Sequence, residues 1–137
     1  MKVAAGSKFT LVALAAALAG CATAEAPATP VLEGSVWQVT SIDGEATRRT
    51  DMYQMEFKDG RASGRFGCNR FSGTYTSTGT TLTLGPTMST RMGCPEPAGT
   101  HEREGLAVLQ QEAQLVWAGS QLTISNTSGS IALERLP

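Results

Sequence analysis

The chain has 137 residues, of which 41% are hydrophobic and 17% charged, and its formal net charge at pH 7 is −1. This length suits one domain of ordinary size, and the composition excludes both a polytopic membrane protein and a disordered acidic tail. The near-neutral charge and the lack of a long basic run offer no general attraction to nucleic acid, so no nucleic-acid partner is expected.

The first twenty residues have the pattern of a bacterial export signal. Lys2 and Lys8 supply a positive start, and the apolar run at 9–18 is far shorter than the roughly 20 residues that a membrane-spanning helix needs. Leu-Ala-Gly then precedes Cys21, which resembles the lipobox of bacterial lipoproteins. This resemblance implies cleavage after residue 20 and lipidation of Cys21. The alternative is an ordinary signal peptide followed by an incidental cysteine.

The segment after Cys21 predicts a tether. Residues 22–32 are rich in Ala, Pro and Thr, a composition that buries little surface and stays extended. No Asp follows Cys21, and under the enterobacterial sorting rule this sends a lipoprotein to the outer membrane, facing the periplasm. We therefore expect a signal peptide at 1–20, a lipidated tether at 21–32 and one folded domain at 33–137.

From residue 33 onward, side chains alternate as they do on strands. A β-branched and aromatic run at 36–42 ends at the turn signal Asp43-Gly44. Tyr53, Met55 and Phe57 alternate with polar neighbours, which predicts a second strand that turns these three side chains toward the core. Asp59-Gly60 predicts a hairpin turn. Further strands or extended segments are expected at 61–68, 73–76, 81–84 and 87–92.

The stretch 64–75 is the most distinctive, because three glycines separate aromatic and polar residues around Cys68. Gly67 indicates a bulge or tight corner between two strands, and Asn69 suits a corner because Asn tolerates positive φ. Asn69 and Arg70 form a candidate binding loop, and the alternative is a structural turn. Three basic side chains gather here and suit an acidic partner, a lipid phosphate or plain solvation: Arg61, Arg65 and Arg70.

One helix is expected after the strands. Thr100 has the residue type of an N-cap, and Leu106, Leu109 and Ala113 follow helical spacing along one stripe. His101 is the only histidine of the chain, and its charged neighbours predict a solvated side chain. The pattern then returns to strands at 114–117, 121–125 and 130–136.

These elements predict a mainly β fold with one helix, of the α+β class. About eight short strands are separated by turn signals every 8 to 12 residues or so, which is typical of a small antiparallel, barrel-like curled sheet. The helix is expected to plug an open end or to pack across the sheet, because its apolar stripe needs a partner.

Cys68 and Cys94 are the two cysteines of the expected folded domain. An exported domain meets an oxidising compartment, which favours a disulfide between them. Two free thiols on separate strands and a metal site are the alternatives, although two cysteines and the distant His101 fall short of a tetrahedral set. We expect no metal and no cofactor.

Two sequence elements are informative together. The first is Gly67-Cys68-Asn69 followed by Phe71, Gly73 and Tyr75, and the second runs from Thr87 to Cys94 through Thr90 and Met92. As a pair they resemble the META domain, the HslJ-like family of bacterial heat-shock and envelope proteins. The resemblance covers about residues 33–136. It implies a small β-rich fold associated with heat-shock response, novobiocin resistance and, in parasites, virulence, without established catalytic residues.

No catalytic motif accompanies this resemblance. The sequence contains no Gly-x-Ser-x-Gly, no His-Glu-x-x-His and no glycine-rich phosphate loop, so we expect no catalytic residues and no enzymatic activity. The resemblance favours an envelope lipoprotein that serves stress tolerance by binding or scaffolding an unknown protein or envelope partner. The alternative is a lysozyme-inhibitor-like or small-ligand-binding β-barrel lipoprotein.

Overall fold

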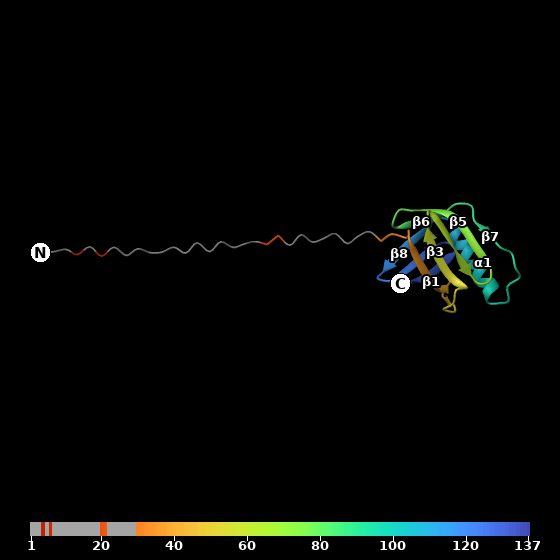
Figure 1. The fold of residues 1–137 in the computed structure, drawn as a ribbon. Coiled ribbons are helices and arrows are strands. Elements are labelled where there is room, and N and C mark those ends of the chain that lie inside the picture. Colours follow the sequence, from red (N-terminus) through yellow and green to blue (C-terminus); the bar gives the residue numbers. More distant parts are fainter. Residues whose placement is uncertain (1–3, 5, 7–19, 22–29) are drawn as a thin grey trace.

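The computed structural model describes residues 4, 6, 20, 21 and 30–137, and the folded domain lies in the last of these ranges (Figure 1). The predicted signal peptide and most of the predicted tether lie outside the described residues. In the part of the chain that is described, no helix combines the length and the apolar character needed to cross a membrane.

Within residues 30–137 the chain forms ten strands and one helix. They are β1 (Ser35–Ile42), β2 (Glu45–Ala46), β3 (Tyr53–Lys58), β4 (Arg61–Phe66), β5 (Arg70–Ser77), β6 (Thr81–Leu84), β7 (Met88–Ser89), α1 (Ala98–Leu109), β8 (Ala113–Ala118), β9 (Gln121–Asn126) and β10 (Gly129–Arg135).

Eight of these strands form a closed antiparallel barrel. Their order is β1, β3, β4, β5, β6, β8, β9 and β10, and pairing of β10 with β1 closes the circle. The two short strands are additions to this circle, because β2 pairs with β1 and β7 pairs with β5. Figure 1 shows β7 beside β5. This architecture confirms the predicted mainly β fold with one helix.

The alternation of side chains along the strands fills the barrel. Tyr53, Met55 and Phe57 on β3 are all buried, as their spacing predicts. The largest fully buried side chains come from most of the barrel wall: Trp37, Ile42, Phe57, Phe66, Leu82, Leu122, Ile124 and Leu133. The interior is therefore a packed core of side chains.

The helix begins earlier than predicted. Pro97 occupies the N-cap position and Ala98 is the first helical residue, so Thr100 lies within the first turn and the predicted cap was wrong. The physical reason is Glu96, whose carboxylate accepts hydrogen bonds from the Thr100 backbone N–H at 3.0 Å and from its hydroxyl at 2.6 Å. A side chain outside the helix thus satisfies an N–H group of the first turn.

The buried stripe of α1 also differs from the prediction. It consists of His101, Gly105, Val108 and Leu109, whereas Ala113 belongs to β8. His101 is 5% exposed and its Nδ1 lies 3.0 Å from the Tyr53 hydroxyl, so the predicted solvation of this histidine was wrong. These side chains and the absence of one at residue 105 let α1 pack against β1, β4, β9 and β10.

Candidate functional site

The corner between β4 and β5 is joined covalently to the segment that precedes α1. Cys68 and Cys94 form a disulfide, with their Cα atoms 5.9 Å apart. Of the three states that the sequence left open, the structure therefore contains the disulfide. Gly67 is required at this corner, because its φ is +149° and a Cβ atom there would lie 2.8 Å from the Ala98 carbonyl oxygen at the start of the helix.

Asn69 serves the same joint. It is 6% exposed, and its Oδ1 accepts hydrogen bonds from the Met92 backbone N–H at 2.7 Å and from the Thr90 hydroxyl at 3.0 Å. Its Nδ2 donates to the Met92 carbonyl oxygen at 3.0 Å. Arg70, the next residue, points outward and is exposed. The candidate loop of Asn69 and Arg70 thus divides into a structural residue and a surface cation.

Glu102 of α1 completes the surroundings of the disulfide. Its Oε2 lies 3.1 Å from Cys94 Sγ, and the carboxylate oxygen and the sulfurs of Cys68 and Cys94 all lie within 4.8 Å of one another. Metal ions bind cysteine as thiolate, and in the disulfide neither sulfur is a thiolate, so the oxidised cluster does not offer two cysteine ligands. In this form the cluster is a packed contact between the corner and the helix.

A groove of about 590 Å³ lies on the outer face of β3, β4 and β5, beside β7. We call it the outer groove. Its lining includes two acidic, two basic, two hydroxyl and one thioether side chain that matter below: Asp51, Glu56, Arg65, Arg70, Ser63, Ser72 and Met88. This volume falls in the range of small-molecule sites, about 300–1,000 Å³.

The register of the sheet places the polar groups of the outer groove in rows. Arg65 on β4 lies directly opposite Arg70 on β5, and Ser63 lies directly opposite Ser72. Met88 on β7 pairs with Ser72, so its side chain extends the hydroxyl row. The predicted basic cluster is therefore brought together on one face, since Arg61 Nη2 also donates to Ser72 Oγ at 2.8 Å.

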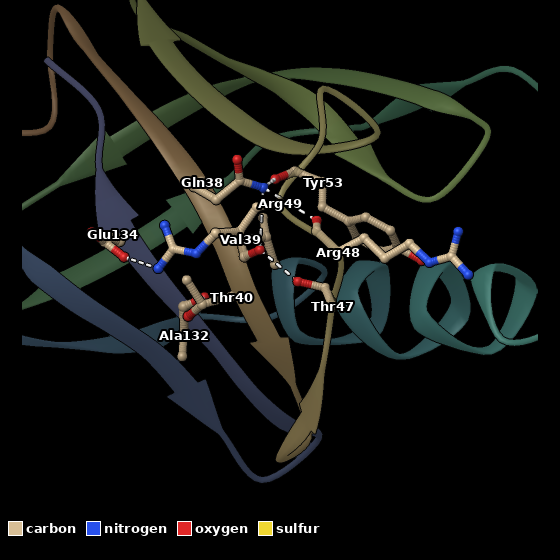
Figure 2. Close-up of polar contacts among 9 residues, drawn as sticks. All are labelled: Gln38, Val39, Thr40, Thr47, Arg48, Arg49, Tyr53, Ala132 and Glu134. Atoms are coloured by element: carbon tan, nitrogen blue, oxygen red, sulfur yellow. Dashed lines mark hydrogen bonds and ion pairs between the residues drawn. The ribbon is translucent and has the colours of Figure 1, made fainter.

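The loop that carries Asp51 to the outer groove is fastened to β1 (Figure 2). Gln38 is 5% exposed, and its Nε2 donates to the carbonyl oxygens of Thr50 in this loop at 3.2 Å and of Tyr53 at 2.7 Å. Arg49 in the same loop pairs with Glu134 of β10. With the loop held in this way, Asp51 Oδ2 lies 3.8 Å from Arg65 Nη1.

A second set of polar contacts ties the start of the domain to the barrel. The exposed Glu33 carboxylate accepts hydrogen bonds from the Tyr75 hydroxyl at 2.6 Å and from the backbone N–H groups of Asp59 and Gly60. The bond from Tyr75 lowers the pKa of Glu33 below 4.5. Burial, followed by the hydrogen bond to Glu33, raises the pKa of Tyr75 to about 12.

Some residues of the outer groove could be predicted from the sequence, and others could not. The three arginines were visible as a cluster, and the period-two pattern of β4 and β5 would have placed Ser63 and Ser72 beside them. Asp51 gave no such signal, and the extended segment at 87–92 suggested an inward Met88, which was wrong because Met88 is 74% exposed. Asp51 comes from an irregular loop, and the groove side of Met88 depends on the pairing of β7 with β5.

Comparisons with known proteins agree with this architecture. The META domain family model matches residues 30–135. A protein solved by NMR has a TM-score of 0.65 at 23% identity, over 73% of this chain and 87% of its own. An NMR structure from Burkholderia xenovorans has a TM-score of 0.59 at 24% identity, over 80% of this chain and 86% of its own.

Because these two structures are only 23% and 24% identical to this chain, the likeness shows a shared fold alone. No curated protein gives a significant match to the sequence. The family model, in contrast, spans most of the chain and includes both the Gly67-Cys68-Asn69 corner and the segment that ends at Cys94. The chain therefore belongs to the META domain family.

Proposed function

We propose that this META domain protein is lipid-anchored in the cell envelope, where it serves heat and novobiocin tolerance by binding a ligand or partner. The observation that carries the binding role is the position of the outer groove. Apolar side chains fill the barrel interior, whereas the groove of about 590 Å³ with its paired arginines opens on the outer wall. The polar groups that suit recognition are thus on the surface.

The anchor is supported by the sequence around Cys21. The basic start, the short apolar run and Leu-Ala-Gly directly before this cysteine occur together. Cys21 is exposed and unpaired, and Leu32, which is 3% exposed, already belongs to the core. Several acyl chains on Cys21 would hold the protein stably at a membrane, for which we propose the periplasmic face of the outer membrane.

A non-catalytic role is supported by the buried position of His101. His101 is the only histidine in the chain, and it is buried against the Tyr53 hydroxyl beneath α1. It lies outside the lining of the outer groove. The side chain best suited to proton transfer near neutral pH thus serves the packing of the helix.

Two measurements test the proposal. Mass spectrometry of the protein purified from the envelope should find an acylated N-terminus at Cys21, and the Cys21→Ser variant should lack it. A deletion strain should lose tolerance to heat and novobiocin, and the wild-type gene should restore it. An unacylated mature N-terminus would remove the anchor, and unchanged tolerance in the deletion strain would remove the stress role.

A lysozyme-inhibitor-like role is the second candidate, because the chain forms a small disulfide-stapled β-barrel, the physical class to which such inhibitors also belong. Inhibition assays on purified lysozymes separate the two. We expect no inhibition, since the volume of the outer groove matches a small ligand better than a flat protein surface.

A further inference from the structure

Two guanidinium groups lie side by side in the outer groove, whose lining also includes the carboxylates of Asp51 and Glu56. Arg65 and Arg70 occupy directly opposite positions on β4 and β5. Like charges at such positions repel each other and destabilise a sheet. Across residues 30–137, Arg65 has one ion pair, at 3.8 Å to Asp51, whose side chain is 81% exposed, and Arg70 has none. The described residues thus give one of these two cations an ion pair and leave Arg70 without one.

Arg65 is also incompletely satisfied. Its side chain is 23% exposed, and its Nε is buried without a hydrogen-bond partner among the described residues. A partly buried cation is costly unless an opposite charge and hydrogen-bond acceptors surround it. An oxyanion on the exposed edge of this guanidinium would supply the opposite charge and accept from its Nη groups, and the planar fork of Arg suits carboxylate and phosphate oxygens.

The positive charge continues along the same face. Lys58 on β3 lies directly opposite Arg61 on β4, which gives a second like-charged pair. Between the two pairs stand the hydroxyls of Ser63 and Ser72. Glu56 is the one acidic side chain among the outward positions of β3, β4 and β5, and Asp51 and Asp59 lie in the adjoining loops. This face is basic although the whole chain has a net charge of −1.

An apolar wall stands beside the cations. Met88 is 74% exposed and lies opposite Ser72, one row away from Arg70, and Val36 adds to the lining. Methionine is flexible and polarizable, and it adapts to ligands of varied shape. The outer groove is also far larger than a single oxyanion, because its volume is about 590 Å³. A bare inorganic ion would leave the apolar wall uncovered.

We infer that the outer groove binds a small amphiphilic anion. Its carboxylate or phosphate oxygens lie between Arg65 and Arg70, with the hydroxyls of Ser63 and Ser72 as further donors, and its apolar part covers Met88. This inference rests on the proposed binding function and names the ligand class. A titration with purified protein tests it separately from any role in stress tolerance.

The test is a ¹H–¹⁵N NMR titration of the full chain carrying Cys21→Ser, which leaves the groove intact and removes the proposed acyl acceptor. The probes are octanoate, octyl phosphate, neutral octanol, inorganic phosphate and an acidic hexapeptide. We expect saturable shifts on β4, β5 and β7 with octanoate or octyl phosphate, at least tenfold tighter than with octanol or inorganic phosphate. The tighter of the two identifies the headgroup as carboxylate or phosphate.

Variants locate the anion. Arg65→Gln combined with Arg70→Gln should weaken binding at least tenfold, while Arg48→Gln, an exposed arginine outside the groove, should leave it unchanged. Arg70→Gln alone changes only an exposed side chain and should weaken binding several-fold in a protein that folds normally. Equal affinity in the double variant, equal binding of octanol, or binding of the acidic peptide alone would overturn the inference.

Discussion

Neighbouring residues at the β4–β5 corner have opposite roles. Asn69 turns inward and uses both its amide oxygen and its amide nitrogen to hold the segment around Met92. Arg70 turns outward into the groove and has no ion pair within residues 30–137. The corner thus holds its own chain through one residue and places the next residue in the lining of the outer groove.

The hydrogen bonds that the Glu33 carboxylate accepts from Tyr75, Asp59 and Gly60, here called the Glu33 clamp, make the free energy of unfolding depend on pH in a defined direction. The pKa of this carboxyl is lowered in the folded state, so its contribution is present above the unfolded value of 4.5 and is lost as pH falls through the folded value. Urea unfolding of wild type and Glu33→Gln should show the variant less stable at about pH 7 and the difference reduced at about pH 3. A difference that stays constant would contradict this role.

The Glu33 clamp also makes stability depend on pH in the alkaline range, through the Tyr75 hydroxyl. The pKa of Tyr75 is raised to about 12, so the neutral phenol is favoured by the fold and its contribution is complete below pH 10. Stability should fall as pH rises from 10 toward 12, and Tyr75→Phe should reduce that part of the fall. Absorbance of ionised tyrosine, followed with stability across this range, provides the measurement.

At the scale of elements, the fit between α1 and the barrel depends on Gly105. A Cβ atom at this position would lie 2.4 Å from Phe66 Cδ2, and Phe66 is fully buried. Gly105→Ala gains about 1 kcal/mol of helix propensity but overpacks the core, which typically costs about 1–3 kcal/mol. We therefore expect net destabilisation in urea unfolding.

Gly93→Ala is the matched control for that variant. A Cβ atom at Gly93 meets no atom within 4 Å, so its effect should stay within about 0.5 kcal/mol. A Gly105→Ala variant at least as stable as wild type would show that the helix shifts easily and that the close contact with Phe66 is unimportant.

The disulfide links the β4–β5 corner of the barrel to a segment that the sheet holds only weakly. β7 pairs with β5 through two residue pairs, and the segment after it depends on Asn69 and on the bond between Cys68 and Cys94. The sequence separation of 26 predicts a loss of roughly 3–4 kcal/mol when the bond is removed, in the chain-entropy model. Urea unfolding of Cys68→Ala with Cys94→Ala should show it, and a loss below about 1 kcal/mol would contradict this.

Sequence patterns were informative where a strand has one face on the core. Tyr53, Met55 and Phe57 alternate clearly, and Asp59-Gly60 forms the predicted turn, with φ of +53° and +71°. Patterns failed at the helix, where Thr100 looked like a cap and His101 looked exposed. Both outcomes depend on residues outside the helix. Glu96 accepts from Thr100, and Tyr53 on β3 contacts His101, and local helix propensity includes neither contact.

At the scale of the whole molecule, the closed barrel puts the side chains that stabilise the fold inside and those proposed to bind a ligand outside. Inward side chains from all around the wall fill the core, so changes to outward positions on β3, β4 and β5 are expected to affect binding more than folding. The outer groove arises because register aligns residues from three strands and β7 adds an apolar edge. Its composition follows from closure and pairing, which no short stretch of sequence specifies.

The proposal that the outer groove of a lipid-anchored barrel carries the function is tested most directly by complementation of a deletion strain under heat and novobiocin. Wild type, Arg48→Gln and the combined Arg65→Gln and Arg70→Gln variant are expressed at equal levels, checked by immunoblot. We expect the first two to restore tolerance and the double variant to fail. Full restoration by the double variant would contradict the proposal.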